Sequence, residues 1–196
     1  MKEVRTIIVT GATGFLGRHV LAEFANTSLK ILAVTRDKSK AQFAPQSAEV
    51  AQVDSRSSTE ELCEFFEATQ GPVVLAHLAT HYSTAHSATD VEKLVDANIS
   101  FPLHLVDALS RAKPGSAVLN ISTLFQHFEN KTYSPVSLYA ATKESFLKLL
   151  DFYAEMKVLR VADLTIGDTY GPDDTRGKLM NLLISNVGSE KTLNLG

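Results

Sequence analysis

Two side chains four residues apart, Tyr139 and Lys143, are the pair in this sequence best suited to acid–base chemistry. They lie in a stretch, 137–156, whose apolar spacing predicts a helix. Four residues make just over one helical turn, so the phenol and the ammonium group share one face. A tyrosine is a poor acid or base near neutral pH because its pKa is about 10. A nearby cation lowers that pKa, which is what general acid–base catalysis near pH 7 requires.

Three glycines near the start of the chain predict phosphate binding. Gly11, Gly14 and Gly17 follow an apolar run at 4–10 and lead into an amphipathic stretch at 15–25. Glycines there allow a tight turn, a close approach of the backbone to a pyrophosphate, and close packing of helix on strand. The helix N-terminus then attracts the phosphates. We predict a dinucleotide at this turn, although the spacing is G-x-x-G-x-x-G and a turn without a ligand is the alternative.

The end of the second predicted strand bears on which dinucleotide binds. In dinucleotide-binding folds an acidic residue here binds the ribose 2′-hydroxyl of NAD, whereas an arginine accommodates the 2′-phosphate of NADP. This chain has Thr35, Arg36 and Asp37 in succession. Arg36 therefore favours NADP, and Asp37 leaves NAD open.

The elements that must position these residues alternate regularly along the chain. β-branched apolar runs predict strands, and the amphipathic stretches between them predict helices. Continuous apolar strands are typical of parallel sheets covered on both faces. The pattern predicts an α/β fold, a doubly wound Rossmann-type parallel sheet with helices on both faces. The predicted strands are 4–10, 29–35, 48–53, 73–78, 117–122 and 158–166; the predicted helices are 15–25, 59–68, 91–110 and 137–156, with a short helix or loop at 37–46.

Composition narrows the class of protein. With 196 residues, 44% of them hydrophobic, the chain suits one α/β domain or one domain and the start of another. A net charge of −3 lacks the basic footprint of a nucleic-acid binder, and no apolar run is long enough to cross a membrane. The single cysteine, Cys63, suits a reducing compartment. We expect a cytoplasmic protein.

We expect two parts in the chain. Residues 1–166 form the NAD(P)-binding Rossmann domain, and residues 167–196 are the start of a C-terminal substrate-binding region. The second part has a predicted helix near 176–186 and then the opening of a strand at 192–196. Because the chain stops where an element begins, we expect a fragment of something longer.

The segment Thr-Gly-Ala-Thr-Gly-Phe-Leu-Gly at 10–17 resembles the signature of the extended short-chain dehydrogenase/reductase family, the NAD-dependent epimerases, dehydratases and reductases of nucleotide sugars. The resemblance continues through His-Leu-Ala at 77–79, the Tyr139–Lys143 pair and Tyr-Gly-Pro at 170–172, and so covers almost the whole chain.

The resemblance implies roles for further residues. Thr123, with Ser122 as the alternative, corresponds to the strand-end hydroxyl that hydrogen-bonds the substrate oxygen and the catalytic tyrosine. Asp54 corresponds to the carboxylate that faces the adenine; capping of the next helix is its alternative role. Asn98 corresponds to a structural asparagine on the long helix. The other residues that the family places at the cofactor are Thr13, Phe15, Leu16, Ser55, Leu78, Ala79, Thr80, Tyr139, Lys143 and Ile166.

The resemblance also bears on the reaction. Sugar-nucleotide 4,6-dehydratases carry Asp-Glu after the strand-end hydroxyl, and this chain has Leu124 and Phe125. Dehydration is therefore disfavoured, and hydride transfer to C4 of a nucleotide-linked keto-deoxyhexose fits better. The stretch 168–178 is similar to reductases of the CDP-abequose and CDP-paratose synthase type. Within it, Arg176 and Lys178 are candidates for a substrate pyrophosphate, or a solvated charge pair.

Several alternatives stay open. The chain could be an epimerase rather than a reductase, a non-catalytic NAD(P)-binding module or sensor of the same fold, or an inactive fragment. The helices 91–110 and 137–156 are candidates for a homodimer interface through Leu105, Phe146 and Phe152, although core packing explains these residues equally well. His77 and His81 have no evident third ligand, so we expect no metal site.

Overall fold

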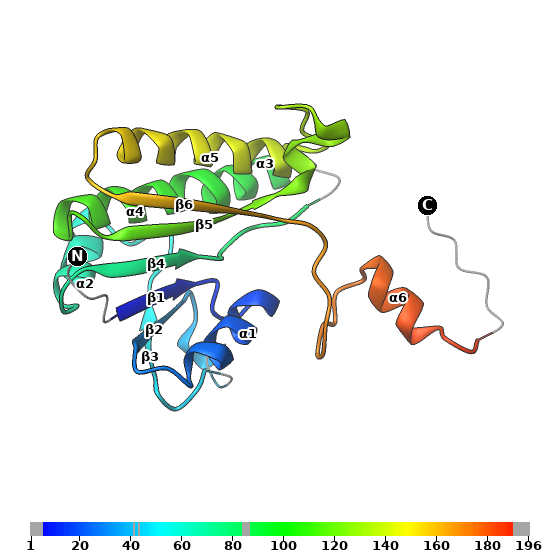
Figure 1. Cartoon of the computed structure of the whole chain (residues 1–196), viewed down its shortest axis with the longest axis horizontal. Coiled ribbons are helices and arrows are strands. Elements are labelled where there is room, and N and C mark those ends of the chain that lie inside the picture. Colours follow the sequence, from blue (N-terminus) through cyan, green and yellow to red (C-terminus); the bar gives the residue numbers. More distant parts are fainter. Residues whose placement is uncertain (1–5, 41, 43, 84–86, 190–196) are drawn as a thin grey trace. The chain divides into compact units, whose positions relative to one another are not determined.

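The computed structural model describes residues 6–40, 42, 44–83 and 87–189. Six strands form one sheet in the order β3-β2-β1-β4-β5-β6, and every neighbouring pair is parallel (Figure 1). The predicted doubly wound parallel sheet is therefore confirmed. The strands are β1 (Thr6–Thr10), β2 (Lys30–Thr35), β3 (Ala48–Gln52), β4 (Val73–His77), β5 (Ala117–Thr123) and β6 (Arg160–Ile166).

The strand order reverses between β1 and β4. β1 pairs with β2 on one side and with β4 on the other, so the loops after β1 and β4 leave the sheet in opposite directions. In open α/β sheets this switch point opens a crevice outside the carboxyl ends of the strands, and ligands bind there. The glycine turn follows β1 directly, so the sequence places it at the crevice.

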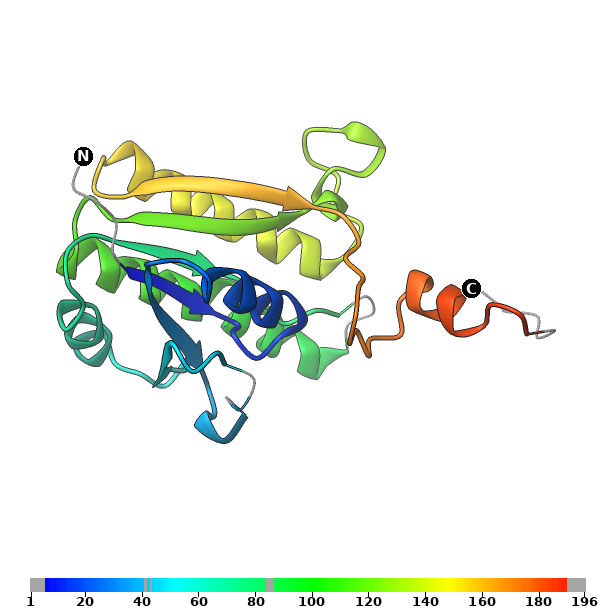
Figure 2. The ribbon, with the colours of Figure 1, turned by 60° about the horizontal axis from the view of Figure 1, so that its bottom comes forward.

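Helices cover both faces of the sheet. α4 and α5 lie on one side, and α1 lies on the opposite side (Figure 2). One core cluster joins Ile8, Leu75 and Val118 of the strands to Leu105 of α4 and Phe146 of α5. A second cluster lies under α1. The helices that precede β6 in the chain are α1 (Phe15–Phe24), α2 (Thr59–Glu67), α3 (Ala88–Val95), α4 (Phe101–Ala112) and α5 (Leu138–Glu155).

The long helix predicted at 91–110 is interrupted. α3 and α4 are joined by one wide π-helical segment, Asp96–Ser100. Pro102 explains the change, because proline has no N–H to donate and its ring crowds the carbonyl four residues earlier. The wider turn includes Asn98, whose side chain is fully buried. π segments of this kind are frequent at functional sites.

The region predicted as a short helix or loop at 37–46 contains one 3₁₀ turn, Lys38–Lys40, and otherwise turns, with residues 41 and 43 outside the described part. Residues Gly167–Gly196 form a second compact unit. Its helix α6 (Leu179–Ser185) is shorter than the predicted 176–186, and the predicted strand at 192–196 lies outside the described residues. No helix in the described part is long and apolar enough to span a membrane.

Candidate dinucleotide-binding and catalytic site

The glycine turn is shaped by backbone packing at two of its three glycines. Gly11 has φ +65°, and a Cβ there would lie 2.6 Å from the backbone nitrogen of Ala79. A Cβ on Gly17 would overlap the carbonyl oxygen of Gly11 and lie 2.8 Å from Cα of Ala12. These two glycines therefore let β1, the loop after β4 and the start of α1 pack together.

Gly14 is different, because little of the protein crowds it. It is the N-cap of α1 with an ordinary φ of −78°, and a Cβ would meet only the Gly11 carbonyl oxygen, at 3.2 Å. No side chain caps this helix, and its first turn has no acidic residue. A helix N-terminus with these properties suits a phosphate group. The turn therefore fits the pyrophosphate of a dinucleotide, with Thr13, Phe15 and Leu16 beside it in the chain.

Asp37 and Arg36, at the end of β2, are the two candidate ligands for the ribose of the cofactor, and their surroundings differ. Asp37 uses one carboxylate oxygen to accept hydrogen bonds from the Ser39 amide, at 3.0 Å, and the Ser39 hydroxyl, at 2.7 Å. These bonds lower the pKa of Asp37 and direct the carboxylate into its own turn. Thr35 is buried and bonds the Asp37 backbone. Arg36 is exposed beside them.

Asp54 follows β3 and does not cap α2. Its Oδ1 accepts a hydrogen bond of 2.8 Å from the Arg56 amide. The cap of α2 is Ser58, which forms a reciprocal capping box with Glu61. The alternative role of Asp54 as helix cap is therefore wrong, because a better cap stands four residues later. Ser55 beside it is exposed.

His77 ends β4 as a buried structural residue. Its Nδ1 lies 2.9 Å from the hydroxyl of Thr10, which also accepts from the Ala79 amide at 3.2 Å. Burial, and secondly the charge of Lys143, lower the pKa of His77 to about 3. The neutral imidazole thus ties β1 to β4 and holds Leu78 and Ala79 against the glycine turn. No cluster of three metal-ligating side chains occurs among the described residues.

This assignment predicts how stability depends on pH. The folded pKa of His77, about 3, lies below its ordinary value of 6.5, so the unfolded chain binds the extra proton between those values. Stability from this group is complete above pH 6.5 and falls as the pH drops. We expect the unfavourable protonation of His77 to lower the free energy of unfolding by about 2 kcal/mol between pH 6.5 and 5. Urea denaturation of wild type and His77→Gln at both pH values measures this, and equal pH dependence in the two proteins would refute the assignment.

Asn98 clamps the loop after β4 onto α5. Its Oδ1 accepts hydrogen bonds from the Thr80 hydroxyl, at 2.9 Å, and from the His81 amide, at 2.8 Å. Its Nδ2 donates to the His81 carbonyl, at 3.0 Å, and to the Thr142 hydroxyl, at 3.1 Å. A single buried amide therefore fixes Thr80 next to the turn of α5 that carries Tyr139. The structural role that the resemblance implied for Asn98 agrees with these contacts.

Tyr139 lies half-buried in the first turn of α5, which Ser137 caps. Its ring packs edge-on against Tyr82, with ring centroids 4.9 Å apart. Burial raises the pKa of Tyr139, and a hydrogen bond with Thr80 opposes that rise. We expected Lys143 to lower the pKa of this phenol, and this is wrong for the protein alone. Tyr139 stays protonated at neutral pH.

Lys143, one turn along α5, is 4% exposed. Burial lowers its pKa to about 8, and the charge of Asp163 on β6 opposes that change. Its ammonium group is therefore largely charged at pH 7.

Thr123 ends β5 and begins the turn that leads toward α5. Its Oγ1 accepts a hydrogen bond of 3.3 Å from the Phe125 amide, and its own amide donates to Oε1 of Gln126 at 2.9 Å. Gln126 is fully buried and donates to Glu144 on α5 at 2.5 Å. Ser122, the alternative, instead donates to Asp163 at 2.8 Å.

Gln126 and Glu144 were missed by sequence reasoning. Together they tie the turn after Thr123 to α5, directly beside Lys143 in the chain. An isolated glutamine in a turn carries no motif, so the only signal available was a polar residue between Phe125 and Phe128.

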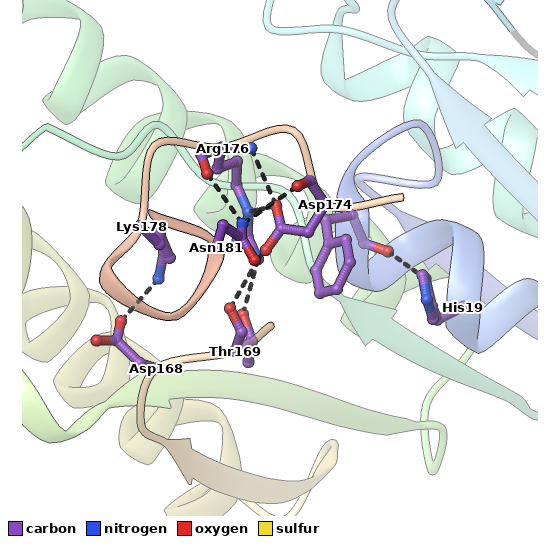
Figure 3. Close-up of polar contacts among 8 residues, drawn as sticks. His19, Asp168, Thr169, Asp174, Arg176, Lys178 and Asn181 are labelled. Carbon is purple, nitrogen blue, oxygen red and sulfur yellow. Dashed lines mark hydrogen bonds and ion pairs between the residues drawn. The ribbon is translucent and has the colours of Figure 1, made fainter. Parts of the chain in front are cut away.

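Two cations of the second unit, Arg176 and Lys178, pair with carboxylates of the same loop. Arg176 binds Asp174 through both carboxylate oxygens, each at 2.6 Å, and donates to the Thr169 carbonyl at 2.9 Å (Figure 3). Lys178 forms an ion pair of 2.8 Å with Asp168 (Figure 3). We expected Arg176 and Lys178 to meet a pyrophosphate or to be solvated. Arg176 is paired with Asp174 and Lys178 with Asp168, both in the same loop. Their contact with a pyrophosphate stays a prediction.

The candidate dimer helices divide into buried and exposed residues. Leu105 and Phe146 are completely buried in the core, so they pack within the chain and are not available to a partner. Phe152 is 60% exposed on α5. The interface remains a prediction that rests on Phe152 alone of the three.

The strand order, the glycine turn at the switch point and the tyrosine–lysine pair on α5 define a Rossmann-type α/β protein. More narrowly, the chain belongs to the NAD dependent epimerase/dehydratase family, whose sequence model matches residues 7–195. The expected fold and family are both confirmed.

Curated relatives share this family at low identity. CDP-abequose synthase of Salmonella typhimurium is 27% identical over 188 residues, which are 95% of this chain and 60% of that protein. UDP-glucuronate 4-epimerase 1 of Arabidopsis thaliana is 24% identical over 85% of this chain and 43% of that protein. The chain thus spans about three-fifths or less of the length of these relatives.

Solved structures agree on the fold. The complex of UDP-glucose 4-epimerase from Thermus thermophilus with NAD has a TM-score of 0.77 at 24% identity, over 88% of this chain and 58% of that one. MoeE5 in complex with UDP-glucuronic acid and NAD has a TM-score of 0.73, also at 24% identity, over 92% of this chain and 60% of that one.

Proposed function

We propose that this chain is the cofactor-binding and catalytic part of a reductase that uses NADPH to convert a nucleotide-linked 4-keto-deoxyhexose to the alcohol. The observation that carries the proposal is the match to CDP-abequose synthase over 95% of the chain. Two features of the site support it: a phosphate-binding turn at Gly14, and a protonated Tyr139 on a helix that begins at the same edge of the sheet.

Tyr139 is in the protonated state that reduction of a ketone requires. Reduction of a ketone requires one hydride at carbon and one proton at oxygen. Bound at the glycine turn, NADPH would supply the hydride and be oxidised to NADP⁺. Tyr139 supplies the proton from its hydroxyl, which burial keeps protonated. The Thr123 hydroxyl orients the carbonyl oxygen, and the nearby Lys143 ammonium group stabilises the phenolate that remains.

The choice of NADPH rests on the end of β2. The 2′-phosphate of NADPH requires a cation, which Arg36 offers at the exposed strand end. The carboxylate that would favour NADH is Asp37, and its Oδ1 is already bonded to Ser39. Thr35 has no charge.

We therefore expect NADPH to raise the melting temperature more than NADH at equal concentration, because a ligand that binds the folded state alone stabilises it. Thermal denaturation with each nucleotide measures the difference. Arg36→Ser is expected to remove the preference, and Arg56→Ser, at the exposed arginine after β3, serves as the matched control. Equal or reversed shifts in the wild type would contradict the role of Arg36.

Turnover tests the function directly. The protein is incubated with NADPH and CDP-, UDP- or dTDP-linked 4-keto-deoxyhexoses, and the loss of NADPH absorbance is followed. The proposal expects oxidation of NADPH in step with formation of the alcohol, fastest with the CDP-linked sugar. Cofactor binding without turnover of any of these sugars would show that the chain acts as a dinucleotide-binding module, and the proposed reductase function would be wrong.

A further inference from the structure

A row of polar side chains crosses the sheet beneath α5. The strand register aligns Thr10 of β1 with His77 of β4, His77 with Asn120 of β5, and Asn120 with Asp163 of β6. All four lie on the face that carries α4 and α5, since their neighbours two residues earlier on each strand belong to the core cluster under those helices. Two contacts join the row, Thr10 to His77 at 2.9 Å and Asn120 to Asp163 at 2.6 Å.

Lys143 lies over this row. Its charge acts on His77 at one position of the row and is balanced by Asp163 two strands away. Asn120 stands between those two positions and is completely buried, and its Oδ1 has no hydrogen-bond partner among the described residues. The side of the row that faces α5 therefore suits a positive charge, because it offers a carboxylate and an amide oxygen and, among the residues that the structure describes, no second cation.

The charge balance around Lys143 depends on Asp163. His77 on β4 is neutral, and Tyr139 on the same helix is protonated. Glu144, the next residue on α5, is bonded to Gln126 in the turn after β5. Asp163 on β6 is the group whose negative charge acts on Lys143.

The Asp163 carboxylate has more hydrogen-bond partners than a charge on an exposed strand needs. β6 is an edge strand, and a charge on an edge discourages pairing with other chains. For that purpose the carboxylate needs no partner. Here Oδ1 accepts from Asn120 at 2.6 Å and from the buried Ser122 hydroxyl at 2.8 Å. Two buried donors orient the charge toward α5, and charge-assisted bonds of this kind are strong.

We propose that Asp163 is a positioning residue of the catalytic site, which holds the Lys143 ammonium group in its charged form on α5, one helical turn from Tyr139. Asn120 and Ser122 aim its carboxylate. The catalytic consequence rests on the proposed reductase function, whereas the effect on Lys143 is a property of the chain itself.

Lysine side-chain NMR tests the effect on Lys143 without substrate or cofactor. In protein with ¹³C-labelled lysines, the Lys143 signal is assigned by its loss in Lys143→Arg and titrated with pH. The wild-type midpoint is expected at about pH 8. In Asp163→Asn, which keeps the shape and removes the charge, we expect the midpoint about one pH unit lower.

Two further variants make the test decisive. Asp163→Thr is a second neutral variant. Threonine suits an exposed strand position, so this variant still tests the proposal if Asp163→Asn does not fold. Glu49→Gln is the matched control, because it removes an exposed carboxylate from β3, the opposite edge strand. The control is expected to leave Lys143 unchanged. Midpoints that stay at the wild-type value in both neutral variants would overturn the proposal, even if those variants self-associate through β6.

Turnover separates this inference from the proposed function. In Asp163→Asn the alkaline limit of kcat is expected to move toward acid by the same interval as the Lys143 midpoint, with KM unchanged. A shifted midpoint in a protein that reduces no keto-sugar would refute the reductase and leave the electrostatic role intact. An unchanged midpoint in an active reductase would refute the role of Asp163 alone.

Discussion

Tyr139→Phe is expected to lower kcat for keto-sugar reduction by about 10²- to 10⁴-fold, the contribution typical of a positioned general acid. The change removes one oxygen, the atom that carries the proton to the substrate. The ring, its edge-on contact with Tyr82 and the cap of α5 at Ser137 remain. NADPH affinity is therefore expected to stay close to that of the wild type, and the melting temperature to fall only slightly through the lost hydrogen bond with Thr80.

Steady-state kinetics and NADPH fluorescence titration measure the two effects separately. Tyr133→Phe is the matched control, because Tyr133 is 58% exposed in the turn region between β5 and α5. It is expected to leave both kcat and NADPH affinity unchanged. If Tyr139→Phe retains more than about a tenth of wild-type turnover, another group donates the proton and the assignment of Tyr139 is wrong.

Substitutions at the glycine turn are expected to separate folding from cofactor binding. Gly11→Ala should lower the free energy of unfolding by about 2–5 kcal/mol, from about 1–2 for the left-handed conformation and about 1–3 for overpacking against Ala79. Gly14→Ala should cost no more than about 1 kcal/mol, because its φ is ordinary and a Cβ would press on one protein atom only, the Gly11 carbonyl oxygen at 3.2 Å. Its methyl group would instead occupy the space for the pyrophosphate, which predicts a loss of NADPH affinity of about tenfold or more.

Gly71→Ala isolates the conformational part of the effect at Gly11. Gly71 has φ +67°, and nothing lies within 4 Å of a Cβ there. Its substitution should therefore cost only the left-handed strain of about 1–2 kcal/mol. Urea denaturation gives the three stabilities, and fluorescence titration gives the NADPH affinities. Normal cofactor binding by a folded Gly14→Ala variant would show that the phosphates do not lie at this turn.

The sequence alone was sufficient to predict the sheet and the positions of α1, α2 and α5. Each of the six predicted strands overlaps an observed strand, since continuous β-branched runs have no competing helical pattern. The long helix at 91–110 was predicted without its interruption, because the periodicity of its apolar residues continues through Asn98 and Pro102. Only the missing N–H of Pro102 forces the wider turn.

The candidate site also has features that the sequence predicted and features that it did not. The sequence by itself determined the groups that are adjacent in the chain: the glycine turn after β1 and the shared face of Tyr139 and Lys143, both of which follow from local backbone geometry. Only the tertiary structure decided what surrounds them. Burial raises the pKa of Tyr139, and Gln126 anchors the turn at Thr123. The register that brings Asp163 beneath α5 joins residues far apart in the chain, and such pairings depend on how the strands align rather than on any local pattern.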